Sequence, residues 1–579
     1  MLVEHGLSQD LAKICGDGQT MSRIMLISEG AEHRTLLLAE QITRHIPEAT
    51  ICGIVYVARA GFFSRLGSGL RLVLSNVVCW VFGLLHGGRP KRSISDQHRP
   101  VGTRQGCNWK VLSTRDIEDP EVAKFASQTA PDLIITLETT HIQSKIALSP
   151  SLGTVQGRVS HVNRNGDKSL LRARPQTDWG LNIRIKHFTR SGEDLLLDFD
   201  LGPQALDSPT GLELKSQVIL RDLLVQSTAT ILRERESKPS DRVRAWAAEM
   251  VPSCFSPHRH SLTDKIKIQV PPLRVRSNWK LCVYSLFLLS PFIVLRNWLR
   301  KLRRRHPVVF LNSHLVSDRE HRMSLPTEAF YCLVRFLKRH YRIVSLPEAV
   351  RLLKSGNIGE PTIVLTFDDG YEDNFVNLRA VSEETGVPVV LFVSSDPVTE
   401  RHEFAHDYDR GLKGFRALSW NQIRYWAADG TEFQSHTCSH FDCGSSDEVL
   451  LRREIVWSKR TLEEQLGRHV TSFSFPFGKL NNMSPIAIAM AERTYDHCFS
   501  CFGGENYPNR CENHRHLFRK HLAANPWECE LELQGVFDIL EPLRALIQIG
   551  LKSLAAKHLQ SGTSPTKNNL DGSALRESE

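Results

Sequence analysis

The sequence lacks the features that mark the extreme classes of protein. Hydrophobic residues make up 41% and charged residues 24% of the chain, which excludes a wholly disordered or collagen-like protein. No apolar run reaches the roughly 18–20 residues that a membrane-spanning helix needs. The net charge of +9 is small for 579 residues, so no nucleic-acid partner is expected. This length predicts about three or four domains.

A disulfide framework is also missing. The 13 cysteines are odd in number and scattered from Cys15 to Cys529, whereas disulfide scaffolds are dense and usually even. Cys498 and Cys501 form one C-x-x-C pair, but no second pair follows at the spacing of a structural zinc site. The first residues carry no apolar core of a signal peptide. Reduced thiols and a cytoplasmic location are therefore expected.

Two shorter apolar stretches allow alternative interpretations. Residues 70–85 and 281–295 both fit a buried helix, and the second also fits a linker. The second is followed by six basic residues and no acidic ones up to residue 305. Because an anionic membrane surface attracts such a combination, residues 281–305 are a candidate for peripheral contact with the inner face of a membrane.

Composition divides the chain into successive regions. The N-terminal part alternates strand-like runs, such as 23–28, 50–57 and 131–136, with helical stretches, which favours a parallel α/β sheet. The predicted organisation is an extension at 1–20, an α/β domain at 21–230, a linker at 231–306, a second domain at 307–545 and a C-terminal helix end with a disordered tail at 546–579.

The second domain also alternates strands and helices. Residues 324–337 are predicted to be helical, and Ser345 and Glu348 have the spacing of a capping box. This alternation fits a barrel or an open sheet, in which active sites lie at the C-terminal ends of the strands. The predicted strands are 308–311, 362–367, 389–393, 432–435 and 473–475.

Chemically active residues follow three of these strands. Asp368 and Asp369 precede Gly370, which permits a tight turn. His436 and His440 are four apart, as on one face of a helical turn. Singly, these could be a surface turn and two unrelated histidines. Together, one carboxylate and two imidazoles can hold a metal, and the other carboxylate can act as general base on a metal-bound water.

The third motif and its neighbours complete a family resemblance. Phe473-Ser-Phe-Pro-Phe-Gly478 can present a backbone N–H as an oxyanion donor. The ordered set TFDDG, SHTCSH and FPFG resembles the NodB-type polysaccharide deacetylases of carbohydrate esterase family 4. This resemblance covers about residues 307–540. It implies a distorted (β/α)7 barrel, with Asp368 as base, a divalent metal, usually zinc, on Asp369, His436 and His440, and Phe477 as the backbone oxyanion donor.

The chain departs from this family at two places. Many members have arginine two residues before the proline of the third motif, where this chain has Ser474. Many also carry a late histidine that supplies a general acid, for which three histidines compete here. His314 matches a histidine often seen in the family's opening strand. The three competing residues are His514, His516 and His521.

The N-terminal half resembles folate-dependent formyltransferases. The similarity lies in PDLIITLETTHIQSKIALSPSLGTVQG and the later DFDLGP. The family's Asn-x-His aligns with Gln156-Gly157-Arg158, and its aspartate with Asp200. An arginine stays protonated and cannot serve as a general base. The resemblance therefore implies a Rossmann-like domain that has lost its catalytic activity.

These observations predict a metal-dependent hydrolase that removes an N-acetyl group from an amino sugar of a polysaccharide, oligosaccharide or glycolipid. Two alternatives stay open. The first alternative is an N-formyl sugar deformylase, which the fused formyltransferase-like half suggests. The motifs do not distinguish formyl from acetyl, because both acyl groups need the same attack geometry. The second alternative is a non-catalytic glycan-binding module, because Gln156 and Arg158 stand where the formyltransferase family has its catalytic residues. The oligomeric state is not indicated by the sequence.

Overall fold

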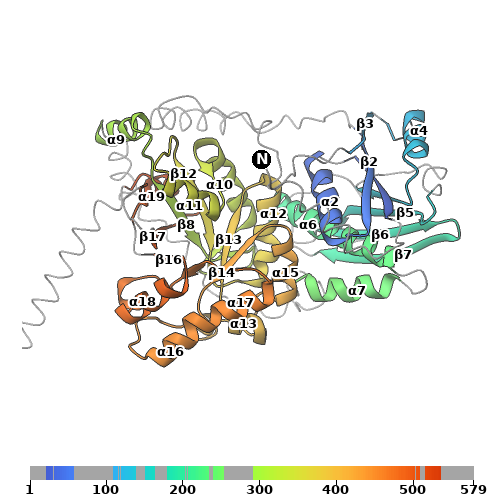
Figure 1. The fold of residues 1–579 in the computed structure, drawn as a ribbon. Helices are drawn as coiled ribbons and strands as arrows, with labels where there is room; N and C mark the ends of the chain where they lie inside the picture. The colour runs from blue at the N-terminus through green and yellow to red at the C-terminus, as the bar shows by residue number, and fades with distance from the viewer. Residues whose placement is uncertain are drawn as a thin grey trace, which may run out of the picture.

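The described part of the computed structural model contains two large sheets, a small two-stranded sheet and one long helix, α6, between the two large sheets (Figure 1). The predicted apolar stretch 70–85, most of 281–295, His514 and the predicted tail lie outside the described residues. The described residues are 21–29, 32–57, 109–137 except 115 and 118, 150–163, 179–201, 204–233 except 205, 239–252, 291–501, 504–508 and 515–535.

The N-terminal sheet has the strand order β3-β2-β1-β4-β5-β6-β7. Its first five strands are parallel and its last two antiparallel, so the predicted parallel α/β arrangement is present with an antiparallel extension. The strands are β1 Ser22–Ser28, β2 Ala49–Val57, β3 Val111–Thr114, β4 Leu133–Leu137, β5 Thr154–Asn163, β6 Trp179–Thr189 and β7 Gly192–Leu201, and the helices are α2 Glu32–His45, α4 Pro120–Thr129, α6 Pro209–Arg233 and α7 Pro239–Met250.

The C-terminal sheet closes into a barrel of seven parallel strands. The order runs β12-β13-β14-β15-β16-β17-β8, and β8 pairs with β12 to close the ring. The short β11 pairs with the first residues of β12. The strands of this sheet are β8 Val308–Ser313, β11 Arg342–Ile343, β12 Thr362–Phe367, β13 Val389–Val393, β14 Glu432–Ser435, β15 Ser472–Ser474, β16 His497–Ser500 and β17 His516–His521. The short strands β9 Leu315–Val316 and β10 Ser324–Leu325 pair with each other in a separate two-stranded sheet.

Local sequence explains where the barrel helices begin and end. Ser345 caps α11 by accepting the Glu348 N–H, and Gly356 ends that helix at φ 75°. The helix predicted at 324–337 begins later, at Thr327. Leu325 precedes Pro326, a position where helical backbone is disfavoured, and it belongs to β10 instead. The helical segments are α9 Pro291–Leu302, α10 Thr327–His340, α11 Leu346–Ser355, η4 Glu372–Phe375, α12 Asn377–Thr385, α13 Ser395–Glu400, α14 Ala405–Tyr408, α15 Trp420–Ala428, α16 Glu448–Arg452, η5 Arg453–Trp457, α17 Ser458–Leu466, η6 Leu480–Asn482, α18 Pro485–Thr494 and α19 Pro526–Leu533.

Helix α6 joins the two domains through buried charges. Lys215 has no exposed side chain, and its Nζ lies 2.5 Å from Asp207 and 2.8 Å from Asp318 of the barrel domain. Asp222 accepts two hydrogen bonds of 2.7 and 2.8 Å from the buried guanidinium of Arg379 on α12. Because a buried charge is costly without its partner, these pairs fix the two domains against each other.

The described residues of the predicted linker 231–306 include two further helices. Helix α7 packs against β7 and α6 of the N-terminal domain, and α9 lies just before β8. The structured part of the N-terminal domain therefore extends past the predicted boundary at residue 230. The reason is that Val243, Ala247 and Met250, spaced three or four apart, supply α7 with a buried apolar face.

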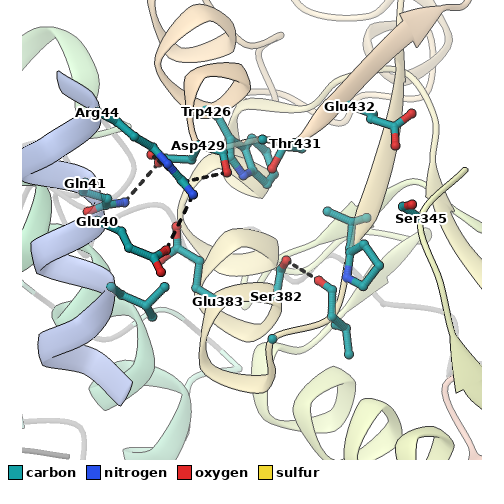
Figure 2. Close-up of a pocket in the computed structure, with 16 residues that line it drawn as sticks. Glu40, Gln41, Arg44, Ser345, Ser382, Glu383, Trp426, Asp429, Thr431 and Glu432 are labelled. Atoms are coloured by element: carbon teal, nitrogen blue, oxygen red, sulfur yellow. Dashed lines mark hydrogen bonds and ion pairs between the residues drawn. The ribbon is translucent and has the colours of Figure 1, made fainter. Parts of the chain in front are cut away.

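A pocket lies between α2 and the barrel (Figure 2). It is lined by the first residues of β13 and β14, so it sits at the N-terminal end of the barrel strands. Gln41 donates a 3.0 Å hydrogen bond to Asp429 across this boundary. On its barrel side, burial raises the pKa of the Glu432 carboxyl to about 7, against a smaller lowering by Arg468.

Replacing Glu432 with glutamine is expected to stabilise the protein at pH 8 and not at pH 4.5. The pKa of Glu432 is higher in the folded protein than its ordinary 4.5, so the native chain loses stability as the pH rises through about 7. The gain at pH 8 should be roughly 1–3 kcal/mol. Urea unfolding at both pH values measures it. Glu464→Gln, at an exposed position, is the control; an equal effect of both changes would contradict the prediction.

Candidate active site at the C-terminal end of the barrel

Two buried carboxylates lie where β12 ends. Asp368 is 3% and Asp369 0% exposed. The chain turns sharply there, with φ of 70° at Asp369 and 91° at Gly370. A Cβ on residue 370 would lie 2.7 Å from the Val393 side chain, so glycine is required by both conformation and space. The turn predicted from Asp-Asp-Gly is therefore present and directs Asp369 into the barrel mouth.

The histidine pair follows β14 in a loop. The sequence predicts a helical turn for His436 and His440, and this is wrong: no helix forms at 436–440. Thr437 and His440 have φ values of 65° and 61°, which an α-helix does not allow. The two rings still meet, with their centroids 5.2 Å apart, because the loop folds back on itself. The Phe441 N–H donates to Thr437 Oγ1 and holds this fold.

The ring orientation of His436 is fixed by the next strand. Its Nδ1 lies 2.8 Å from the backbone oxygen of Ser474. Since a carbonyl oxygen can only accept, Nδ1 must carry the proton. In the neutral ring this leaves the lone pair on Nε2, which points toward Asp369 Oδ1 at 3.5 Å. A hydrogen bond from one ring nitrogen to a backbone oxygen is how metal-binding histidines are commonly oriented.

Asp369 is surrounded by imidazoles. Its oxygens lie 3.2 Å from His440 Nε2, 3.5 Å from His436 Nε2 and 3.8 Å from His406 Nε2. Neither oxygen has a hydrogen-bond donor in acceptable geometry among the described residues. Burial opposes ionisation, but His440 and His436 hold the pKa of Asp369 well below its usual range. An ionised, buried carboxylate without donors needs a positive charge beside it.

A divalent cation would supply that charge. Ligand atoms of Asp369, His436 and His440 lie within 4.8 Å of one another. One carboxylate and two imidazoles are a donor set that suits zinc and related ions and leaves positions open for water and substrate. The residues present therefore fit a metal at this place.

Asp368 is paired with an arginine that the sequence analysis missed. Arg519 of β17 donates two hydrogen bonds of 2.7 Å to the Asp368 carboxylate and one of 2.6 Å to Ser474 Oγ. Burial works against ionisation of Asp368, while Arg519 lowers its pKa. The family resemblance places arginine at position 474. In the structure the guanidinium of Arg519, from β17, lies beside both Asp368 and Ser474.

His406 was also missed. Its ring lies 4.8 Å from that of His440, and its Nε2 is 2.9 Å from the Tyr371 hydroxyl. Burial, more than any charge, lowers the pKa of His406 to about 4. This residue belongs to a long segment between β13 and β14 that carries no motif, so no sequence signal pointed to it.

His314 and the three histidines considered as general acids lie in different places. His314 follows β8 and is close enough to Asp369 and Asp368 for both carboxylates to act on its pKa, which burial lowers. His516 begins β17 with a ring nitrogen 2.8 Å from Ser500 Oγ, whereas His521 ends that strand in an exposed position. His514 lies outside the described residues. Of the three that the structure describes, His314 is therefore the one that lies near the carboxylate pair.

Phe477 lies at the edge of this cluster. Its φ is 61°, and no described residue accepts a hydrogen bond from its N–H. Its ring is 51% exposed and meets the His440 ring edge-on at 5.0 Å. A Cβ on Gly478 would lie 2.6 Å from the backbone nitrogen of Cys501. The close packing at Gly478 fixes the turn that leaves the Phe477 N–H available.

The aligned formyltransferase positions do not form a cluster of this kind. Gln156, Gly157 and Arg158 lie in β5, and Arg158 is exposed. Gly157 packs under Leu220 and Leu224 of α6. Asp200 on β7 accepts a 2.8 Å hydrogen bond from Asn182 of β6. The inactivity inferred for this half from sequence stays a prediction.

Comparison with known proteins places the second half of the chain in a class. Residues 355–493 match the family model described as polysaccharide deacetylase. A Bacillus subtilis protein, YxkH, described as a polysaccharide deacetylase, is 22% identical over 174 residues, which are 30% of this chain and 56% of that protein. The chain thus spans about half the length of this curated relative. Residues 355–493 in its C-terminal half therefore match a polysaccharide deacetylase domain.

Two solved structures show the range of the structural likeness. IcaB from Ammonifex degensii is 20% identical, with a TM-score of 0.34 over 40% of this chain and 97% of that one. Phosphoribosylglycinamide formyltransferase from Bacillus halodurans is 10% identical, with a TM-score of 0.23 over 37% of this chain and 97% of that one. The barrel assignment rests on the strand pairing of this chain rather than on these scores.

Proposed function

We propose that the protein is a metal-dependent hydrolase that removes an N-acetyl group from an amino sugar in a polysaccharide, oligosaccharide or glycolipid. The observation that carries this proposal is Asp369, a buried carboxylate that has no hydrogen-bond donor in acceptable geometry among the described residues and faces the imidazoles of His436 and His440. The motif resemblance and the deacetylase domain supply the reaction class.

The metal would be held by Asp369, His436 and His440, and zinc is the expected ion. When bound, it would polarise the acyl carbonyl and lower the pKa of a water. Asp368 is the proton acceptor for the attacking water, and Arg519 keeps this carboxylate ionised and fixed in direction. A histidine would protonate the departing amine. The Phe477 N–H donates to the oxygen that gains charge.

The substrate would enter at the C-terminal end of the strands. Phe477 offers a half-exposed ring beside His440, and an aromatic face is suited to the apolar side of a sugar ring. The described cysteines are all free thiols. This agrees with the proposal that the enzyme works in a reducing compartment, in the cytoplasm.

A release assay tests the proposed reaction. Purified full-length protein is incubated with free, oligomeric and lipid-linked N-acylated amino sugars, and acetate and formate are both quantified. We expect acetate release that o-phenanthroline abolishes and added zinc restores. Formate release in place of acetate would replace the deacetylase by a deformylase. If metal-loaded protein released neither product but bound the glycans, the glycan-binding module would be the better description.

A further inference from the structure

Helix α9 turns its polar side toward the protein. Arg296 and Asn297 both make hydrogen bonds of 2.7 Å to Gln534, and Arg300 pairs with Glu505 and the Tyr507 hydroxyl. Ile293 is the single buried apolar side chain of this helix. A surface helix of a globular protein ordinarily does the opposite and packs its apolar stripe on the core.

The outward side of α9 is apolar. Phe292, Leu295, Trp298 and Leu302 are 62%, 53%, 57% and 65% exposed. Their spacing of three, three and four residues places them along one side of the helix. We call these four side chains the α9 strip. Single exposed apolar residues are common, but a row of large ones marks a contact surface.

The charges around the α9 strip indicate what it contacts. Residues 291–306 contain no acidic side chain. Lys301, Arg303, Arg304 and Arg305 are exposed at the C-terminal end of the helix. An apolar strip with a tryptophan, followed by a cationic cluster, has the composition of helices that lie in the interface of an anionic bilayer. The sequence just before α9, LCVYSLFLLS, is apolar as well.

We propose that the α9 strip docks on an anionic lipid surface, with the helix parallel to the membrane plane. At 12 residues, α9 is about 18 Å long. In the part of the chain that the structure describes, no helix has the length and apolarity needed to cross a membrane. The proposal concerns the lipid surface alone and does not depend on the catalytic assignment.

The docked helix would turn the catalytic mouth away from the lipid. Helix α9 leads directly into the start of β8, whereas Asp368, Asp369 and His436 follow the ends of β12 and β14. Since all barrel strands are parallel, α9 and the mouth lie at opposite ends. Figure 1 shows this, with α9 at the upper left and α13 and α16, which follow the strand ends, at the bottom.

Vesicle flotation of the full-length protein tests the proposal. We expect binding to vesicles of phosphatidylcholine with phosphatidylglycerol, weak binding to phosphatidylcholine alone, and release at high salt. The double change Trp298→Ser and Leu302→Ser should weaken binding at least roughly tenfold, because burial of two large apolar side chains is lost. Trp457→Ser is the matched control, since Trp457 on η5 is 54% exposed and should not matter.

A second variant separates charge from apolar contact. Gln in place of Arg303, Arg304 and Arg305 should remove the preference for anionic vesicles while keeping the α9 strip. Native protein that binds neither vesicle, or Trp298→Ser, Leu302→Ser protein that binds as well as native, would overturn the proposal. So would a native dimer that the same double change dissociates without lipid, because the strip would then be covered by a second copy. Acetate release, measured alongside, should be unchanged in every variant.

Discussion

Asp369→Ala is expected to lower kcat/KM at least about 1,000-fold and to abolish metal retention. The change removes the one carboxylate that faces both His436 and His440 at 3.5 and 3.2 Å. His436→Ala should have a similar effect, because it removes the ring that Ser474 orients. Acetate release and metal content per chain, measured on the same preparations, check both expectations.

The stability of the Asp369→Ala protein distinguishes lost chemistry from lost folding. Chelation should lower the unfolding temperature of the native protein, since a metal that binds only the folded state stabilises it. The variant should show no such dependence, and it lacks the unpartnered buried carboxylate. Asp442→Ala, at an exposed position two residues beyond His440, is the control. A variant with native activity and native metal content would refute the ligand assignment.

Arg519→Ser is expected to reduce kcat/KM by about 100-fold or more and to cost about 3–5 kcal/mol of stability. It leaves Asp368 buried without the two 2.7 Å hydrogen bonds that hold it. The loss should fall mainly on kcat, because Arg519 acts through the base rather than on the sugar. Steady-state kinetics and urea unfolding measure the two effects. Arg515→Ser, at an exposed position just before β17, should change neither.

The same variant offers a rescue that a merely structural arginine would not give. Ser474 Oγ lies 2.6 Å from the Arg519 guanidinium, so an arginine at position 474, at the end of β15, would start close to the carboxylate that Arg519 holds. We expect Ser474→Arg combined with Arg519→Ser to recover much of kcat, and Ser474→Arg alone to be harmful through crowding of two cations. If the combined variant stayed as inactive as Arg519→Ser, the pairing of Asp368 with a guanidinium would not be what catalysis requires.

Much of the barrel could be predicted because its strands are continuous apolar runs. The run Thr362–Phe367 is buried at every position, and the polar residues at the end of such a strand must lie at the mouth. The same reasoning brought Asp369, His436 and His440 to one end without any knowledge of distances. The loop conformation at 436–440 could not be predicted, since a four-residue spacing suits a helical turn and a folded-back loop equally well.

Arg519 and His406 show where sequence reasoning stops. Arg519 lies inside a strand, 151 residues from Asp368, and only the closing of the barrel between β17 and β8 brings the two together. The histidines around Arg519 drew attention because they match a family pattern, while the arginine matches none. His406 reaches Asp369 from a segment whose course depends on tertiary packing, here on the hydrogen bond between Tyr371 and Asp407.

Helix α6 has an evolutionary consequence. Arg379 is fully buried in the barrel domain, and its carboxylate partner Asp222 belongs to the N-terminal half. Asp318 likewise depends on Lys215. Arg379 keeps Glu383 and Asp429 as partners within its own domain, so a deletion of the N-terminal half would remove one partner from each of these two buried groups rather than all of them. The barrel domain without the N-terminal half should therefore be less stable than the full chain, which would favour keeping that half as a scaffold whether or not it binds a ligand.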